Sequence, residues 1–340
     1  MNTQTNEVTV ETQEESRKLV KKANLCLLIT VSVYLLVSLV AGVVSMVLGE
    51  QMPFFKSAVF QIVLIQTIMI LPACFFLKKN KLGLKEFLRF KNMKPATWLL
   101  VVLFTVVSYP IVASMNYVSQ LFAENMVQDT VVDLINGVPL PLVVVIIALL
   151  PCCVEEFIFR GVMYGAYQKQ GKIKAMLLTA VLFGLFHLNI NQMSYAIAMG
   201  ILMVCLNEAT GSILSSMLMH FLINGFSVVS SAYYIKKYGS LPDTEVTFQV
   251  PTLIALLVFS VISLVIAKFI LDGIAKIEGR KTIWQSFQQP KEEKGKVLSA
   301  SLVVVFVLCI LFLVLSEVGT RMQFNMSENT KASIEKQLGE

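Results

Sequence analysis

Long apolar runs separated by short polar stretches dominate the chain. A membrane-spanning helix needs about 20 apolar residues, and nine runs reach or approach that length. We expect the short sixth run, 192–206, to be tilted or to span only part of the membrane. No strand-like alternation stands out, so the pattern predicts an all-α, polytopic bundle of about nine membrane helices. The runs cover residues 23–48, 54–77, 96–121, 138–163, 173–190, 192–206, 211–235, 250–272 and 297–316.

Composition supports a bilayer as the environment of these helices. Hydrophobic residues make up 56% of the 340 positions and charged residues only 15%, against roughly 25% charged in an ordinary soluble domain. These values exclude a pair of soluble domains, a disordered chain and a collagen-like fibre. The six cysteines all lie in apolar runs, where a thiol behaves as a small hydrophobe, so we expect no disulfide framework.

The distribution of charge predicts the orientation. The net charge is +6, but lysines and arginines gather in loops such as 78–94, as cytoplasmic loops facing anionic lipid do. Nucleic-acid binding is therefore not supported. The connection 122–137 has Glu124, Asp129 and Asp133 and no Lys or Arg, so it should be external. With the N-terminus in the cytoplasm, nine crossings put the C-terminus outside the cell. We expect the membrane to be the plasma membrane.

This topology divides the chain into segments of different character. We expect the fourth to seventh runs to form the functional core, with outer helices on either side and a polar C-terminal tail of little order. The segments are a cytoplasmic N-terminal segment 1–22, outer helices 23–137, a catalytic core 138–235, C-terminal helices 236–316 and a polar tail 317–340.

Ionisable side chains interrupt only three of the apolar runs near their centres. Such groups cost several kcal/mol in a membrane and are functional candidates. A single buried histidine usually has a structural role. That role does not account for the whole set of ionisable candidates, which includes both histidines of the chain. These candidates are Glu155, Glu156 and Arg160 in the fourth run, His187 in the fifth, and His220 with the neighbouring Asn224 in the seventh.

Helical spacing distinguishes the two glutamates. Residues four apart share a helix face, whereas adjacent residues diverge by about 100°. Glu156 can therefore pair with Arg160, and Glu155 points elsewhere and is free to bind a water molecule. His220 and Asn224 are also four apart and should face one cavity.

Two neighbours of these candidates add local constraints. Phe183 lies one turn before His187 and can pack beside it. Pro151 precedes Glu155 by four residues and cannot donate a hydrogen bond to the carbonyl of Ile147. We therefore expect the helix to kink just ahead of the two glutamates.

Two chemistries fit these side chains, and both lead to hydrolysis. In the first, Glu155 and His187 act on a water as a general base, while His220 and Asn224 donate to the developing oxyanion. In the second, Glu155, His187 and His220 bind a divalent metal such as zinc, which lowers the pKa of its bound water. The residues alone do not decide between them.

The three motifs resemble those of the CPBP intramembrane proteases, also called the Abi family, which includes the type II CAAX prenyl endopeptidases. The family pattern is a Glu-Glu-x-x-x-Arg helix, a Phe-x-x-x-His helix and a His-x-x-x-Asn helix. All three are intact and in order within about 140–235. They are Glu155, Glu156 and Arg160; Phe183 and His187; and His220 and Asn224.

The resemblance implies an intramembrane endopeptidase whose site lies inside the helical bundle. It implies that Glu155 is the water-activating base together with His187, and that His220 and Asn224 are oxyanion or secondary groups. Whether the family requires a metal has been argued both ways. The implied partners are a membrane-associated peptide or protein substrate and the lipid bilayer, and a CAAX substrate is not assumed.

Other functions fit the sequence less well. The chain has no His-Glu-x-x-His zinc-protease motif, and Ser216 lacks the Gly-x-Ser-x-Gly setting of a nucleophile. Cys152 and Cys153 have no neighbouring cation to activate a thiol. A proton-coupled transporter would suit buried Glu and His, but no inverted repeat accompanies them. A catalytically silent scaffold is a further alternative. The intact Glu155 and His187 argue against it.

Overall fold

The protein is a bundle of long helices. The computed structural model describes residues 2–123, 127–241, 248–288 and 296–338, and every regular element in these ranges is helical. Eight helical segments are long and apolar enough to cross a membrane. The predicted polytopic all-α fold is therefore confirmed.

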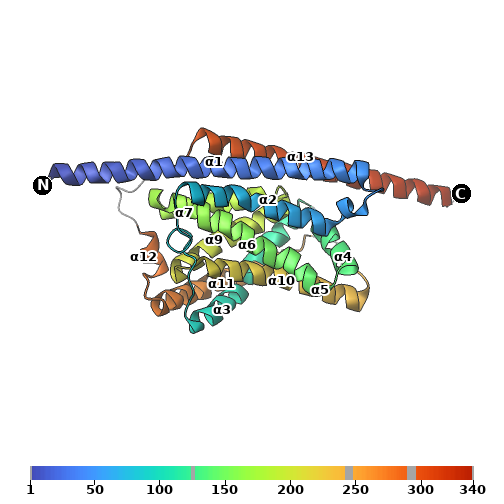
Figure 1. Cartoon of the computed structure of the whole chain (residues 1–340). Coiled ribbons are helices and arrows are strands. Elements are labelled where there is room, and N and C mark those ends of the chain that lie inside the picture. Colours follow the sequence, from blue (N-terminus) through green and yellow to red (C-terminus); the bar gives the residue numbers. More distant parts are fainter. Residues whose placement is uncertain (1, 124–126, 242–247, 289–295, 339–340) are drawn as a thin grey trace.

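Most of the predicted runs correspond to single long helices (Figure 1). The match is good at the N-terminal ends, where Pro95 and Pro251 lie in the first turns of their helices. The long helices are α1 (Asn2–Leu48), α2 (Ala58–Lys79), α3 (Pro95–Gln120), α8 (Lys172–Phe186), α9 (Ile190–Thr210), α10 (Ile213–Tyr238), α11 (Val250–Ile277) and α13 (Ala300–Leu338).

The fourth run is one continuous rod, Leu140–Gln170, with an irregular interior. Two of its stretches are π-helical, one on each side of the two glutamates. Pro151 follows the first stretch and has no amide hydrogen to donate, which explains why regular α-helical bonding stops there. The rod consists of α5 (Leu140–Val144), a π stretch Val145–Leu149, α6 (Leu150–Glu156), a π stretch Phe157–Met163, α7 (Tyr164–Tyr167) and a 3₁₀ turn Gln168–Gln170.

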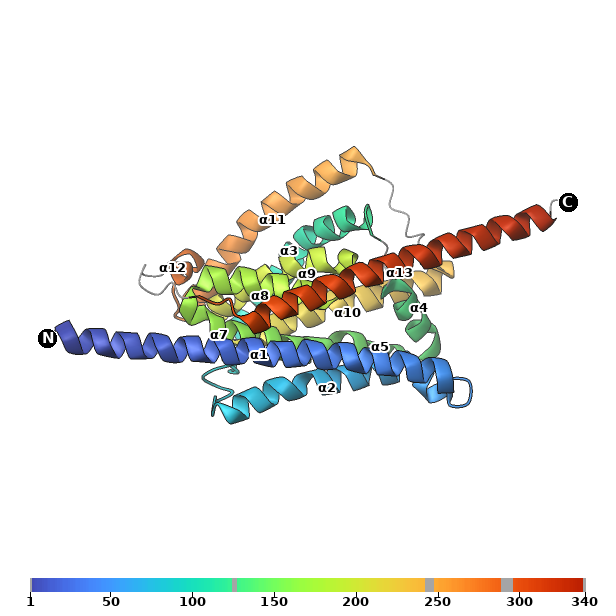
Figure 2. The ribbon, with the colours of Figure 1, turned by 90° about the horizontal axis from the view of Figure 1, so that it is seen from above.

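The ends of the chain lie at opposite ends of the bundle (Figures 1 and 2). Helices α1 and α13 pack against each other along one side, with α2 beside α1 (Figure 2). Large apolar side chains are exposed along α1, α11 and α13, as expected of surfaces that face lipid tails. Among the described residues, eight helices are long and apolar enough to span a membrane, one fewer than the nine predicted runs.

The fifth and sixth runs differ from expectation in length. The predicted helix 173–190 ends at Phe186 as α8, which has 15 residues. At 1.5 Å per residue it is about 22 Å long, short of the roughly 30 Å apolar core of a bilayer. The predicted short run 192–206 is instead the full-length helix α9, with 21 residues. The shortened helix is thus α8, which ends just before His187.

A local turn explains this boundary. Leu188 has a positive φ of 52°. This conformation is uncommon for a residue with a side chain and lies outside the right-handed helical region, so the helix ends there. The Asn189 side chain then accepts a hydrogen bond from the backbone N–H of Gln192 at 2.9 Å and caps the start of α9. The sequence Leu188-Asn189 therefore stops one helix and begins the next within two residues.

Three peripheral segments are more helical than predicted. The connection 122–137 contains helix α4 (Val127–Gly137), although Glu124 lies outside the described residues. Helix α13 continues to Leu338, so the polar segment after 316 is helical. Helix α1 begins at Asn2, so the segment 1–22 is helical as well.

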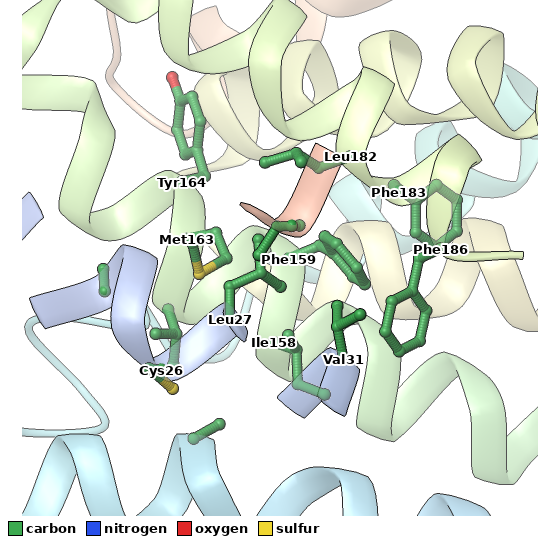
Figure 3. Close-up of a cluster of buried hydrophobic side chains, with 14 of the residues drawn as sticks. Cys26, Leu27, Val31, Ile158, Phe159, Met163, Tyr164, Leu182, Phe183 and Phe186 are labelled. Carbon is green, nitrogen blue, oxygen red and sulfur yellow. The ribbon is translucent and has the colours of Figure 1, made fainter. Parts of the chain in front are cut away.

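A large apolar cluster packs the rod against its neighbours (Figure 3). Leu27 and Val31 of α1 meet Ile158 and Phe159 of the rod from one side, while α8 closes the cluster from another. Phe159 is fully buried, and its ring lies edge-on to that of Phe183 with centroids 5.3 Å apart. This packing fixes the orientation of the rod, and with it the direction of the two glutamates.

A buried ion-pair cluster joins the loops at the N-terminal end of the bundle. Glu208 of α9 is fully buried and accepts hydrogen bonds from Arg89 and Lys172, each at 2.5 Å. The Arg280 Nε donates to the Glu208 backbone carbonyl at 2.8 Å. Basic side chains from three segments of the chain therefore meet at Glu208, two at its carboxylate and one at its backbone carbonyl.

Replacing Glu208 by glutamine is expected to destabilise the protein without altering the site chemistry. The change leaves two cations facing each other around a neutral amide. Arg89 and Lys172 are 21% and 23% exposed, so water relieves part of the penalty. We expect a loss of roughly 2–3 kcal/mol, below the 3–5 kcal/mol typical of a fully buried pair.

Thermal unfolding in detergent measures this effect. Glu86→Gln is the matched control, since Glu86 is exposed in a loop at the same end of the bundle and should unfold like wild type. Equal unfolding temperatures for the two variants would contradict a stabilising role for Glu208.

Candidate active site

Glu156 is the centre of a buried charged cluster. Its side chain is fully buried at the end of α6, and its Oε1 accepts a hydrogen bond from Arg160 Nη1 at 2.9 Å. The predicted i,i+4 pair is therefore formed, even though Arg160 lies in a π-helical stretch. This carboxylate also faces His220 of α10, whose Nδ1 lies 3.1 Å from the same oxygen. Glu156 thus links the rod to α10.

The Arg160 guanidinium is held by an aromatic ring as well as by the carboxylate. It lies over the ring of Phe183, 4.0 Å from the centroid, in a cation–π arrangement. On α9, a Cβ atom at Gly200 would come within 3.2 Å of Arg160 Nη2 and 2.8 Å of the Ala180 Cα. Only glycine at this position lets α8, α9 and the guanidinium approach so closely.

Phe183 also places the two histidines on either side of itself. Its ring lies edge-on to His187 with centroids 4.9 Å apart, and edge-on to His220 at 5.8 Å. The His187 Nδ1 is 2.8 Å from the Phe183 backbone carbonyl. A carbonyl only accepts hydrogen bonds, so Nδ1 carries the proton and Nε2 is left for other partners.

Glu155 points away from Glu156, as its helical position predicts. It lines a cavity of about 210 Å³ together with His187, Gln66 and Gln192. Its Oε2 lies 3.9 Å from the His220 Nε2, which is beyond direct hydrogen-bond distance. The cavity therefore brings a carboxylate and an imidazole to the same space, next to the second imidazole.

Asn224 is set apart from the other candidates. Its Nδ2 donates to the Ile147 backbone carbonyl at 3.3 Å, the acceptor that Pro151 cannot satisfy. The same side chain lines a second cavity of about 260 Å³ between α3, α4, α9 and α10. The structure therefore gives Asn224 a partner in the irregular part of the rod rather than in the Glu155 cavity.

Comparison with known proteins identifies this segment. The sequence profile of the family described as "Type II CAAX prenyl endopeptidase Rce1-like" matches residues 137–226. That range contains all six candidate residues. Residues 137–226 are therefore similar to the CPBP family.

The chain is also similar to a protein of Bacillus subtilis (strain 168) named "Putative membrane peptidase YdiL". It is 27% identical to this chain over 130 residues, which cover 38% of this chain and 52% of that protein. The alignment therefore spans about half the length of the relative. No solved structure matches the chain.

The CPBP motifs do not assemble a metal site in this structure. Within the described parts of the chain, no three His, Cys, Asp or Glu side chains are placed so that they could share a cation. Glu155 and His220 approach to 3.9 Å, and His187 approaches the pair only across the cavity. The donor set thus does not fit a zinc ion in this conformation, and we derive no step through a metal.

Two of the alternative nucleophiles, Ser216 and Cys152, make hydrogen bonds to backbone carbonyls of their own helices. Ser216 is fully buried, and its hydroxyl donates to the Ile213 carbonyl at 3.0 Å and accepts from Asn207 Nδ2 at 3.1 Å. All six cysteines are free thiols, in agreement with the sequence prediction. Cys152 directs its sulfur to the Leu149 carbonyl at 3.0 Å.

Sequence reasoning missed one polar neighbour of the CPBP motifs. Gln66 of α2 lies beside Glu155, with its Nε2 3.3 Å from Oε1. Gln66 is outside the range that the family profile matches. A glutamine in the middle of an apolar helix is itself a signal, because an amide is costly in lipid without a partner.

Glu156→Gln is expected to lower the free energy of unfolding by roughly 3–5 kcal/mol, because it leaves the Arg160 guanidinium buried without a counter-ion. The Arg160 and Glu156 side chains are 1% and 0% exposed, so water cannot compensate. Unfolding in detergent and the yield of folded protein measure the effect.

Glu155→Gln provides the matched control, since it makes the same chemical change one residue earlier, away from the guanidinium. It should retain the wild-type unfolding temperature. If both variants unfold alike, the proposed division of roles between the two glutamates is wrong.

Proposed function

We propose that this protein is an intramembrane endopeptidase that hydrolyses peptide bonds of membrane-associated peptides or proteins with a water activated by Glu155. One observation carries the proposal. Of two adjacent glutamates, Glu156 is engaged by Arg160 and His220, whereas Glu155 lines a cavity that it shares with His187. A carboxylate and an imidazole on one cavity form a general-base arrangement.

The reaction begins at Glu155. Its carboxylate takes a proton from the water as the water oxygen attacks the scissile carbonyl carbon, and it later returns that proton to the departing amine. His187 presents Nε2 to the same cavity, because its Nδ1 is committed to the Phe183 carbonyl. His187 Nε2 thereby accepts a hydrogen bond from the water and orients it.

The tetrahedral intermediate carries negative charge on the former carbonyl oxygen. His220 Nδ1 donates to the Glu156 carboxylate, so Nε2 carries a second proton only in the imidazolium form, and in that form His220 donates to the oxyanion from Nε2. Asn224 lines the neighbouring cavity and donates to the Ile147 carbonyl, so we assign it a supporting role next to His220 rather than a contact with the oxyanion. Glu156 and Arg160 act indirectly, by holding the His220 ring in orientation.

The lysine-rich end of the bundle is proposed to face the cytoplasm. Arg89, Lys172 and Arg280 converge there on Glu208, and the N-terminus lies at the same end (Figure 1). By the positive-inside rule this end is cytoplasmic and the C-terminus is external. The plasma membrane is the membrane that this assignment fits.

Purified protein in liposomes tests the proposed activity. The liposomes also contain a defined library of single-span membrane peptides, and mass spectrometry detects the products. We expect new peptide termini with wild type. Ion and proton flux are recorded on the same vesicles, because a transporter would move solute without cutting the library. Flux without cleavage would overturn the proposal.

A further inference from the structure

Gln66 makes a polar contact that the family motifs do not include. It lies in the middle of α2, an outer helix, and is 92% buried, with 8% of its surface exposed. Its Nε2 is 3.3 Å from Glu155 Oε1, and both side chains line the 210 Å³ cavity that His187 also lines. No other residue of α2 combines a neutral hydrogen-bonding group with contact to Glu155.

The other end of the Gln66 amide has no partner among the described residues. Its Oε1 is buried and accepts no hydrogen bond there. The arrangement does not depend on which way the amide is turned. The nitrogen must face the carboxylate, because two oxygens would repel, so the acceptor oxygen is the free one. A buried polar atom without a partner is rare and calls for a ligand.

We infer that Gln66 is a positioning residue of the proposed peptidase, which holds Glu155 and the attacking water in register. This role rests on the proposed function. The amide nitrogen donates to one carboxylate oxygen and leaves the other oxygen to accept a proton from the water. The amide oxygen is itself buried, so the two hydrogens of the water remain for Glu155 Oε2 and His187 Nε2.

The inference extends the site beyond the matched segment. The range 137–226 supplies the base and both imidazoles, while α2 supplies the group that orients them toward the water. Helix α2 packs directly against the rod that carries Glu155. The outer helices are therefore part of the catalytic unit, and the core 138–235 alone would lack a component.

Gln66→Met tests this role, because methionine keeps the length and fills the space but does not donate a hydrogen bond to Glu155. We expect kcat to fall about 10–100-fold, the size expected for one hydrogen bond to a charged group, with KM within about twofold of wild type. The unfolding temperature should not decrease, since an unpartnered polar atom is removed from the interior. The substrate is the library peptide that wild type cleaves fastest.

Two further variants separate orientation from packing. Gln61→Met makes the same change one turn earlier on α2, where the glutamine donates to the Phe55 carbonyl and does not line the cavity, and it should leave kcat unchanged. Gln66→Glu restores an acceptor but places a second carboxyl beside Glu155, so it should be at least as impaired as Gln66→Met.

The outcomes distinguish this inference from the function it rests on. Wild-type kcat in Gln66→Met, together with an inactive Glu155→Gln, would overturn the role of Gln66 and leave the peptidase intact. A loss of kcat matched by a lower unfolding temperature would show that Gln66 only supports the fold. Full activity of Glu155→Gln would instead overturn the proposed function itself.

Discussion

Replacing Glu155 by glutamine is expected to lower the rate of peptide cleavage by roughly 10²–10⁴-fold, the usual contribution of a general base. Glutamine has the shape of glutamate but cannot take a proton from water. It can still face Gln66, so the packing around the cavity is preserved. Cleavage of the library peptides in liposomes, normalised to folded protein, measures the loss.

Comparative peptide profiling extends this test to native substrates. Membranes from cells with wild type and with Glu155→Gln should differ in a limited set of peptide termini, which would also identify the substrates. Because the variant should unfold at the wild-type temperature, a change in protein amount cannot account for the difference. Identical profiles combined with full in vitro activity would show that Glu155 is not the base.

The site motifs were predictable because membranes make polar residues conspicuous. In a helix surrounded by lipid, a glutamate or histidine stands out against the apolar background. The i,i+4 rule then paired Glu156 with Arg160, which the structure confirms at 2.9 Å. The same rule left Glu155 free, and it does line a cavity. Local geometry was sufficient because both partners lie on one helix.

Contacts between distant segments were not predictable in this way. Glu208 lies near the C-terminal end of α9, yet it is fully buried between Arg89 and Lys172. Arg89 comes 119 residues earlier in the chain. Nothing in the local pattern specifies that pairing. Only the packing of the loops at one end of the bundle creates it.

The length of the fifth helix shows a further limit of hydropathy. The apolar run continues beyond His187, so composition alone predicts a longer helix. The boundary comes instead from backbone conformation, with Leu188 at positive φ and Asn189 capping α9. Ending α8 at Phe186 turns the chain inside the bundle, which brings His187 to the cavity of Glu155.

The rod that carries the glutamates combines a partly correct prediction with a missed consequence. Pro151 was expected to kink the helix ahead of Glu155; the helix is instead continuous, with a π-helical stretch before Pro151. The sequence did not reveal that Asn224 would donate to the carbonyl that Pro151 leaves free. The third motif therefore supports the shape of the first, in addition to any role in the reaction.

His220→Ala is expected to lower kcat by roughly 10²–10³-fold, the usual loss for one oxyanion donor. The buried pair of Glu156 and Arg160 persists without the imidazole, so the fold should survive. Ser216→Ala is the control, since Ser216 is equally buried one turn earlier on α10. It should retain activity, which would also exclude Ser216 as a nucleophile.

Elemental analysis of the same samples decides between the two hydrolytic schemes. If His220 is an oxyanion donor, wild type and His220→Ala contain no stoichiometric zinc, and a chelator leaves wild-type cleavage unchanged. If His220 is a ligand, zinc content and activity fall together in the variant. The first scheme is favoured because, among the described residues, no third donor joins Glu155 Oε2 and His220 Nε2, which lie 3.9 Å apart. One zinc per wild-type chain, with activity lost to a chelator and restored by zinc, would overturn that preference.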